Sequence, residues 1–139
     1  MDYKRIDDSI LLRLDPEEEI CASVLQVAEA EGITVAEITG IGAAKSFSIG
    51  VFAPAEKRYY ENSFEGAYEI TSLLGTLTTK DGAPYLHLHM NAGDRSGMVF
   101  GGHLTRAIIG VTAEIVIRML PGTVERHTNP DIGVNQMIF

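Results

Sequence analysis

The chain has 139 residues, which is typical of one domain, and we expect residues 1–139 to form a single folded unit. Its 11 basic and 19 acidic residues give a formal net charge of −8, which disfavours direct DNA binding because the basic residues do not cluster in the sequence. One cysteine excludes an intrachain disulfide, and there is neither a signal peptide nor a long apolar run, so we expect a cytoplasmic protein without a membrane partner.

The N-terminal part predicts a strand followed by a helix. Residues 9–14 alternate apolar and polar side chains, as a half-buried strand does. Asp15 is expected to cap the helix, because Pro16 suits the first helical position and Glu18 lies three residues after the cap. Gly32 is expected to end it in a left-handed conformation. The apolar stripe of this helix consists of Ile20, Cys21, Val24, Leu25 and Ala28.

The rest of the chain predicts strands separated by turns. Gly40 and Gly42 indicate a bend that divides the first stretch into two strands, Glu65-Gly66 breaks the next one, and Asp81-Gly82 predicts a hairpin. A loop is expected at 91–97, and the tail from Pro121 is expected to be loop-like with a turn at 129–131. Strands are expected at residues 34–52, 58–64, 68–79, 85–89 and 106–120, with an edge strand at 136–139. One helix against many strands joined by short turns predicts an α+β fold with a mostly antiparallel sheet.

Three of the four histidines lie within the seventeen residues from His87 to His103. Successive side chains of a strand point to opposite faces, so His87 and His89 share one face. Gly101 and Gly102 permit a close approach of the returning chain, which brings His103 beside them. We expect these three imidazoles to form a metal site, whereas His127 lies in a polar tail and is expected at the surface.

Three nitrogen ligands fit a zinc ion that keeps one position open. Nickel, copper and iron(II) accept the same ligands, so the residues favour a divalent transition metal with zinc as the first candidate. The competing interpretation is that the histidines only form hydrogen bonds or face solvent.

Three carboxylates are candidates for a supporting role at such a site. Glu69, Asp94 and Glu114 each have the chemistry to orient a ligand histidine or to act as a general base. Glu114 falls on the polar face of the strand at 106–120, opposite an apolar face with Val111 and Ala113. A solvated strand face or an ion pair explains each carboxylate equally well.

Other catalytic motifs are absent. The sequence has no G-x-S-x-G elbow, no phosphate-binding loop and no H-E-x-x-H helix, and Cys21 on the apolar helix stripe is expected to be an inert buried thiol. No catalytic residue is therefore assigned, and both enzymatic activity and any small-molecule substrate stay open.

An ordered set of motifs resembles the plant-and-prokaryote-conserved (PPC) domain. The motifs are Glu65-Gly66-x-Tyr68-Glu69-Ile70-x-Ser72-Leu73-x-Gly75, His87-x-His89, Gly101-Gly102-His103-Leu104 and Thr112-x-Glu114-Ile115. The resemblance implies an α+β fold with one principal helix, assembly as a homotrimer, and metal binding through His87, His89 and His103. Prokaryotic members that consist of this domain alone are commonly labelled as DNA-binding. In the plant proteins an AT-hook carries most DNA contact, and this chain has no Arg-Gly-Arg-Pro hook.

Three functional hypotheses follow. The first is a trimeric metal-binding protein, the second a pure trimerisation module, and the third a DNA-associated regulator. Metal binding ranks first because the histidine spacing supports it, and DNA contact ranks last because of the net charge.

Overall fold

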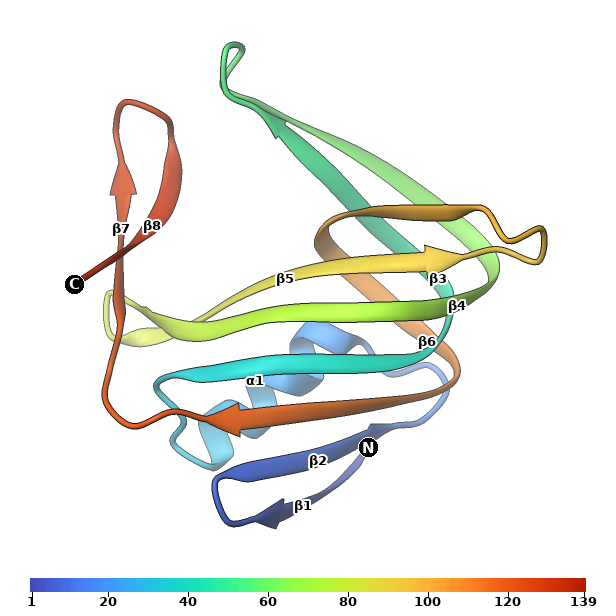
Figure 1. Cartoon of the computed structure of the whole chain (residues 1–139), viewed down its shortest axis with the longest axis horizontal. Coiled ribbons are helices and arrows are strands. Elements are labelled where there is room, and N and C mark those ends of the chain that lie inside the picture. Colours follow the sequence, from blue (N-terminus) through green and yellow to red (C-terminus); the bar gives the residue numbers. More distant parts are fainter.

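A computed structural model describes residues 1–139, and strands make up most of it (Figure 1). The helix is neither long nor apolar enough to cross a membrane. The elements in chain order are β1 (Asp2–Ile6), β2 (Ser9–Leu14), α1 (Ile20–Ala30), β3 (Ala36–Ala53), β4 (Arg58–Lys80), β5 (Ala83–Gly93), β6 (Val99–Met119), β7 (Glu125–Asn129) and β8 (Val134–Ile138).

The strands form one sheet in the order β1-β2-β6-β3-β4-β7-β8, and β5 pairs with both β4 and β6. The strands β6, β3, β4 and β5 therefore hydrogen-bond in a closed ring. All pairs are antiparallel except β4 with β7, which meet in parallel at Thr79 and Glu125. The prediction of a mostly antiparallel sheet with one helix is confirmed, with this parallel pair as an addition.

The long strands correct several predicted boundaries. β3 is one continuous strand, because it pairs along its length with β4 and with β6. The pairing register shifts between Gly40 and Gly42 and between Ala44 and Ser46, but the strand does not end there. The predicted break at Glu65-Gly66 is also wrong, since β4 continues through Gly66 at φ +132°. β5 extends to Gly93, where a loop was expected.

The helix begins later than the sequence predicts. Its N-cap is Glu19, whose carboxylate accepts hydrogen bonds from the backbone N–H of Cys21 (3.1 Å) and Ala22 (2.6 Å). The same carboxylate accepts from the N–H of Ala107 in β6 (3.1 Å), so the cap also joins the helix to the sheet. The predicted capping role of Asp15 is wrong. Glu17 has φ +75°, which is not a right-handed helical conformation, so the helix cannot begin directly after Asp15. The left-handed Gly32 at φ +63° is confirmed.

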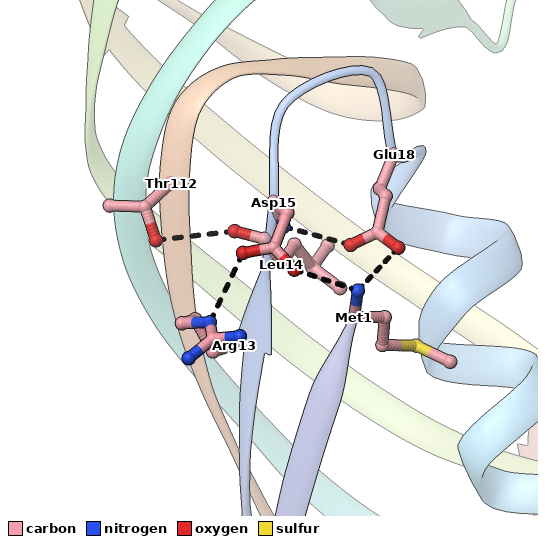
Figure 2. A network of polar contacts seen from close by, with 6 residues as sticks. All are labelled: Met1, Arg13, Leu14, Asp15, Glu18 and Thr112. Carbon is pink, nitrogen blue, oxygen red and sulfur yellow. Dashed lines mark hydrogen bonds and ion pairs between the residues drawn. The ribbon is translucent and has the colours of Figure 1, made fainter.

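Asp15 instead belongs to a polar network at the turn between β2 and α1 (Figure 2). The Met1 ammonium donates to Asp15 Oδ2 (3.0 Å) and to Glu18 Oε1 (2.5 Å), and Arg13 donates to Asp15 Oδ1 (3.2 Å). Thr112 of β6 donates to the Leu14 carbonyl (3.2 Å). These contacts tie β1, β2 and β6 together beside the helix.

The core lies between α1 and one face of the sheet. The predicted helix stripe packs there, together with Ser23 and Val27, which the sequence pattern missed. Val111 was expected on the buried face of β6 but is 66% exposed. The reason is a register shift: Gly42 pairs with Ala113 whereas Ala44 pairs with Ile109, and the extra β6 residues between them break the alternation.

The tail contains more regular structure than predicted. The expected turn joins β7 to β8, but β7 itself was predicted as loop. The two strands form a hairpin that stands at the edge of the sheet, with the C-terminus beside it (Figure 1). This hairpin matters because it forms one wall of the histidine pocket.

Candidate metal centre

The structure brings the three predicted histidines together. His87 and His89 lie two residues apart on β5, and His89 pairs directly with His103 on β6. The closure of β5 onto β6 therefore places the third imidazole beside the first two.

The spacing of the rings matches a three-histidine metal site. The ring centroids are 5.3 Å apart for His87 and His89, 5.1 Å for His87 and His103, and 5.5 Å for His89 and His103. Tetrahedral zinc with ordinary zinc–nitrogen bonds places the centroids of its imidazole ligands about 5.2 Å apart. One nitrogen from each ring lies within 4.8 Å of the others. The donor set fits a transition-metal ion.

Glycines permit the close backbone approach that the site requires. A Cβ at Gly75 of β4 would lie 2.0 Å from the carbonyl oxygen of His87, and one at Gly102 would lie 2.7 Å from the carbonyl oxygen of Gly50 on β3. The expected close approach is confirmed at Gly101, where a Cβ would meet Asn91 on β5, the strand that carries His87 and His89. Gly75 lies inside the strand predicted at 68–79, and nothing local in the sequence indicates its close contact with His87.

Tyr59 is a site residue that sequence reasoning missed. Its ring lies edge-on to His103 at a centroid distance of 5.9 Å, and its hydroxyl donates to the His103 carbonyl (3.1 Å). Gly50 leaves room for this ring, because a Cβ there would lie 2.5 Å from Tyr59 Cζ. Only the pairing register of β3 with β4 and β6 brings these residues together, and no local sequence signal encodes it.

Burial keeps two of the imidazoles neutral. His87 and His103 are half-buried, and His89 is exposed. Burial lowers the pKa of His87 to about 4, and the neighbouring charges of His103 and Arg126 act in the same direction. Burial also lowers the pKa of His103, with His89 as the second cause. Neutral imidazole is the form that binds metals, so the site is prepared for ligation at neutral pH.

The histidines face a pocket of about 870 Å³. Tyr59 and Phe52 of the β3–β4 hairpin contribute to it, as do Tyr85 of β5 and Val134 and Asn135 of β8. A pocket of this size accommodates a small organic molecule in addition to a metal ion.

Arg126 of β7 lies behind this pocket and is only 4% exposed. It donates from Nε to Thr78 Oγ1 (2.8 Å), from Nη1 to the Asn135 carbonyl (3.0 Å) and from Nη2 to Thr76 Oγ1 (3.3 Å). Its guanidinium lies over the Tyr85 ring at 5.0 Å. Arg126 therefore fastens the β7–β8 hairpin onto β4 and β5.

The three predicted carboxylates lie elsewhere in the chain. Glu69 and Glu114 are exposed and border a hollow beside Ile41, and neither lines the histidine pocket. The Asp94 carboxylate accepts from Ser96 N–H (2.8 Å) and Met98 N–H (3.1 Å), which closes the turn between β5 and β6. The chain thus gathers the three histidines but none of the three carboxylates.

The two remaining residues singled out in the sequence behave as expected. His127 is exposed on β7, away from the other histidines. Burial raises the pKa of the Cys21 thiol to about 12, which keeps it protonated and unreactive.

The sequence model of the Plants and Prokaryotes Conserved (PCC) domain matches residues 1–121, which confirms the resemblance found in the motifs. Comparison with curated proteins found no match.

Three solved structures are similar over nearly the whole chain. A protein of Bacteroides thetaiotaomicron provisionally named as DNA-binding has a TM-score of 0.97 and 30% identity, covering 99% of this chain and 96% of its own. A metal-containing protein of Archaeoglobus fulgidus has a TM-score of 0.88 and 28% identity, covering 100% and 99%. A plant- and prokaryote-conserved (PPC) protein of Pyrococcus horikoshii has a TM-score of 0.84 and 30% identity, covering 99% and 95%.

Proposed function

The chain belongs to the Plants and Prokaryotes Conserved (PCC) domain family, and we propose that it is a metal-binding member that holds one divalent transition metal on His87, His89 and His103. Zinc is the first candidate. We further propose that residues 1–139 act as one domain, and that the protein works in the cytoplasm, where its single thiol stays reduced.

One observation carries the proposal: all three centroid distances, 5.1 to 5.5 Å, agree with the spacing that zinc imposes on its imidazole ligands, about 5.2 Å. One nitrogen from each ring lies within 4.8 Å of the others, so one ion can be reached from all three rings. The metal-containing relative of Archaeoglobus fulgidus supports the proposal.

A bound metal would supply a Lewis acid at the floor of the pocket. The protein contributes the positions of the ligands: the paired strands fix His89 against His103, and Gly75 lets His87 reach the same point. Tyr59 holds the His103 backbone through its hydroxyl and shields one side of the ring. Apart from the three histidines and two tyrosines, no titratable side chain lines the pocket, so the proposal covers binding and names no reaction.

The test is metal content with a matched control. Purified wild-type protein, dialysed and analysed for elements, should contain about one zinc or other transition-metal ion per subunit. His89→Ala should lose it, because two imidazoles bind far more weakly than three. His127→Ala removes a histidine outside the site and should keep the metal. A wild type that neither contains nor takes up zinc, nickel, copper or iron(II) would contradict the proposal.

We also propose that the subunits assemble as a homotrimer. Large apolar side chains are exposed on β2, β3 and β4: Leu11 is 48% exposed, Ile41 57% and Leu74 54%. They border one hollow of about 660 Å³. Exposed apolar patches of this kind mark protein contacts, and sedimentation should give three times the subunit mass. If triple substitution of the histidines removed only metal and left the trimer, assembly would be an independent function.

DNA binding is the alternative function, because the Bacteroides thetaiotaomicron relative is provisionally named for it. The net charge of −8 makes DNA binding the weaker of the two proposed functions. Duplex binding requires clustered lysines and arginines, and five of the eleven basic side chains here pair with carboxylates. We expect no mobility shift of duplex DNA at low salt. A shift that weakens as salt increases would favour the alternative.

A further inference from the structure

The histidine pocket contains no acidic side chain, although the chain carries 19 of them. Its lining consists of imidazoles, aromatic rings, aliphatic side chains, a threonine, an asparagine and glycines. Three neutral imidazoles leave the charge of a bound divalent ion uncompensated. Within its own pocket, this chain supplies no anion to balance it.

Arg126 adds a second positive charge without an acidic partner. Of the other ten basic side chains, five pair with a carboxylate and the remaining five are exposed to solvent; the paired ones are Arg5, Arg13, Lys45, Lys80 and Arg118. The buried Arg126 has only neutral partners, namely two threonine hydroxyls, a backbone carbonyl and the Tyr85 ring. A buried charge normally has a partner of opposite sign, so its absence here is informative.

The position of Arg126 connects it to the same pocket. Its Nη2 donates to Thr76, which is the direct cross-strand partner of His87. Its guanidinium covers Tyr85, which lines the pocket two residues before His87. The uncompensated guanidinium of β7 therefore lies beside β4 and β5, and its positive charge would add to that of a metal ion held by the imidazoles.

We infer that the histidine pocket selects an anionic ligand, a small organic carboxylate with an apolar or aromatic body. The inference rests on the proposed metal site, because the metal supplies most of the positive charge. We infer the carboxylate because the pocket has no acidic side chain of its own to balance the charge of a metal ion. The apolar body follows from the walls, which include Phe52, Tyr59, Tyr85 and Val134. A carboxylate needs fewer hydrogen-bond donors than a phosphate does, and the Asn135 amide already donates one of its N–H groups to Tyr85.

The first test compares two ligands of the same shape on zinc-loaded wild-type protein. Phenylacetate and phenylacetamide differ in charge but hardly in size, and isothermal titration gives the affinity of each. Phenylacetate should bind about tenfold more tightly or better, since its charge is attracted by the metal and by Arg126. Equal affinities, or no binding of phenylacetate, would overturn the inference.

A pair of variants tests the charge argument from the protein side. Val134→Asp places a carboxylate in the pocket wall and should weaken phenylacetate binding about tenfold, because the pocket then supplies its own anion. Val134→Asn introduces a polar side chain of the same size as aspartate but without its charge, and it should bind phenylacetate more tightly than Val134→Asp does. If both variants bind phenylacetate equally, the missing negative charge is not what selects the ligand.

Zinc content, measured in the same samples, separates the two proposals. A wild type that binds no zinc would remove the metal site and this inference with it. A zinc-loaded wild type without preference for the carboxylate would remove the inference and leave the metal site intact.

Discussion

Two hollows on this molecule differ in how their charges are arranged. The histidine pocket, about 870 Å³, has no acidic side chain in its lining. The second, which we call the β2–β3 hollow, measures about 660 Å³ and has a balanced set, namely Asp2, Lys4, Arg13 and Glu114. It also contains the exposed apolar side chains of Leu11, Ile41 and Leu74.

The difference separates a site for small ligands from a surface for protein contact. The acidic and basic side chains of the β2–β3 hollow balance in number. Another molecule that binds there would therefore mainly cover its exposed apolar side chains. The histidine pocket has the opposite composition: three imidazoles and no acidic side chain line it, and the buried Arg126 nearby has only neutral partners. The β2–β3 hollow is suited to the apolar surface of another molecule, whereas the histidine pocket is suited to a ligand with negative charge.

The largest expected effect is at Gly75, because the close backbone contact of this glycine with His87 is specific to the histidine pocket. In Gly75→Ala the new Cβ would lie 2.0 Å from the His87 carbonyl oxygen, a backbone atom that cannot move without its strand. We expect a loss of about 3 kcal/mol in the free energy of unfolding, with weaker zinc binding. Chemical denaturation and zinc titration measure the two effects.

Gly93→Ala is the matched control for this steric argument. Gly93 lies on β5, but the nearest atom to a Cβ there is 3.8 Å away, an ordinary contact. Its stability should stay close to that of the wild type. If the two variants were equally stable, close packing against Gly75 would not be what positions His87.

The next effect concerns Arg126, which fastens the hairpin wall of the pocket. Arg126→Gln removes the fork that joins Thr76, Thr78 and Asn135 and should cost about 2 kcal/mol. Arg58→Gln is the control, because Arg58 also lies over a tyrosine ring, at 4.8 Å from the Tyr60 centroid, but on the exposed hairpin. Hydrogen exchange should show faster opening of β7 and β8 in the first variant only. Unchanged exchange there would argue that Arg126 does not hold the wall.

The grouping of the three histidines was predictable from the sequence because the information is local. Alternation on a strand places His87 and His89 together, and the glycine pair before His103 indicates a close return. The helix and the antiparallel sheet follow from the same kind of pattern. The carboxylates could not be placed in this way, because Glu69 and Glu114 face outward on strands whose neighbours depend on the whole sheet.

The pocket walls were beyond sequence reasoning for the same reason. Tyr59 lies 44 positions before His103, and Arg126 lies 50 positions after Thr76, so both contacts arise from long-range pairing. Val111 shows a further cause: a register shift in β6 reverses the face of one side chain without any local signal.

A smaller effect should appear in the pH dependence of the metal-free protein. The pKa of His87 is lowered from 6.5 to about 4, so between these values the unfolded chain binds a proton that the folded chain does not. The free energy of unfolding should therefore fall as the pH falls from about 6.5 to about 4, with no contribution from His87 above this window.

His87→Gln should flatten this part of the profile, measured by urea denaturation at several pH values. The exposed His127→Gln is the control, since His127 lies on β7 outside the pocket, and it should retain the wild-type slope. An unchanged slope in His87→Gln would show that burial of this imidazole does not govern the acid sensitivity.

The smallest effect on the folded subunit, and the sharpest test of the β2–β3 hollow, is expected for Ile41→Lys. Ile41 is 57% exposed and pairs directly with Glu114, so a lysine there gains a cross-strand carboxylate, and the free energy of unfolding of the subunit should change by no more than about 0.5 kcal/mol. The same charge placed in an apolar interface must be desolvated, so sedimentation should show loss of the trimer. Ile138→Lys, at a side chain 43% exposed on β8, should leave assembly unchanged. A trimer that survives Ile41→Lys would mean that the subunits meet through another surface, and the contrast between the two hollows would then rest on the histidine pocket alone.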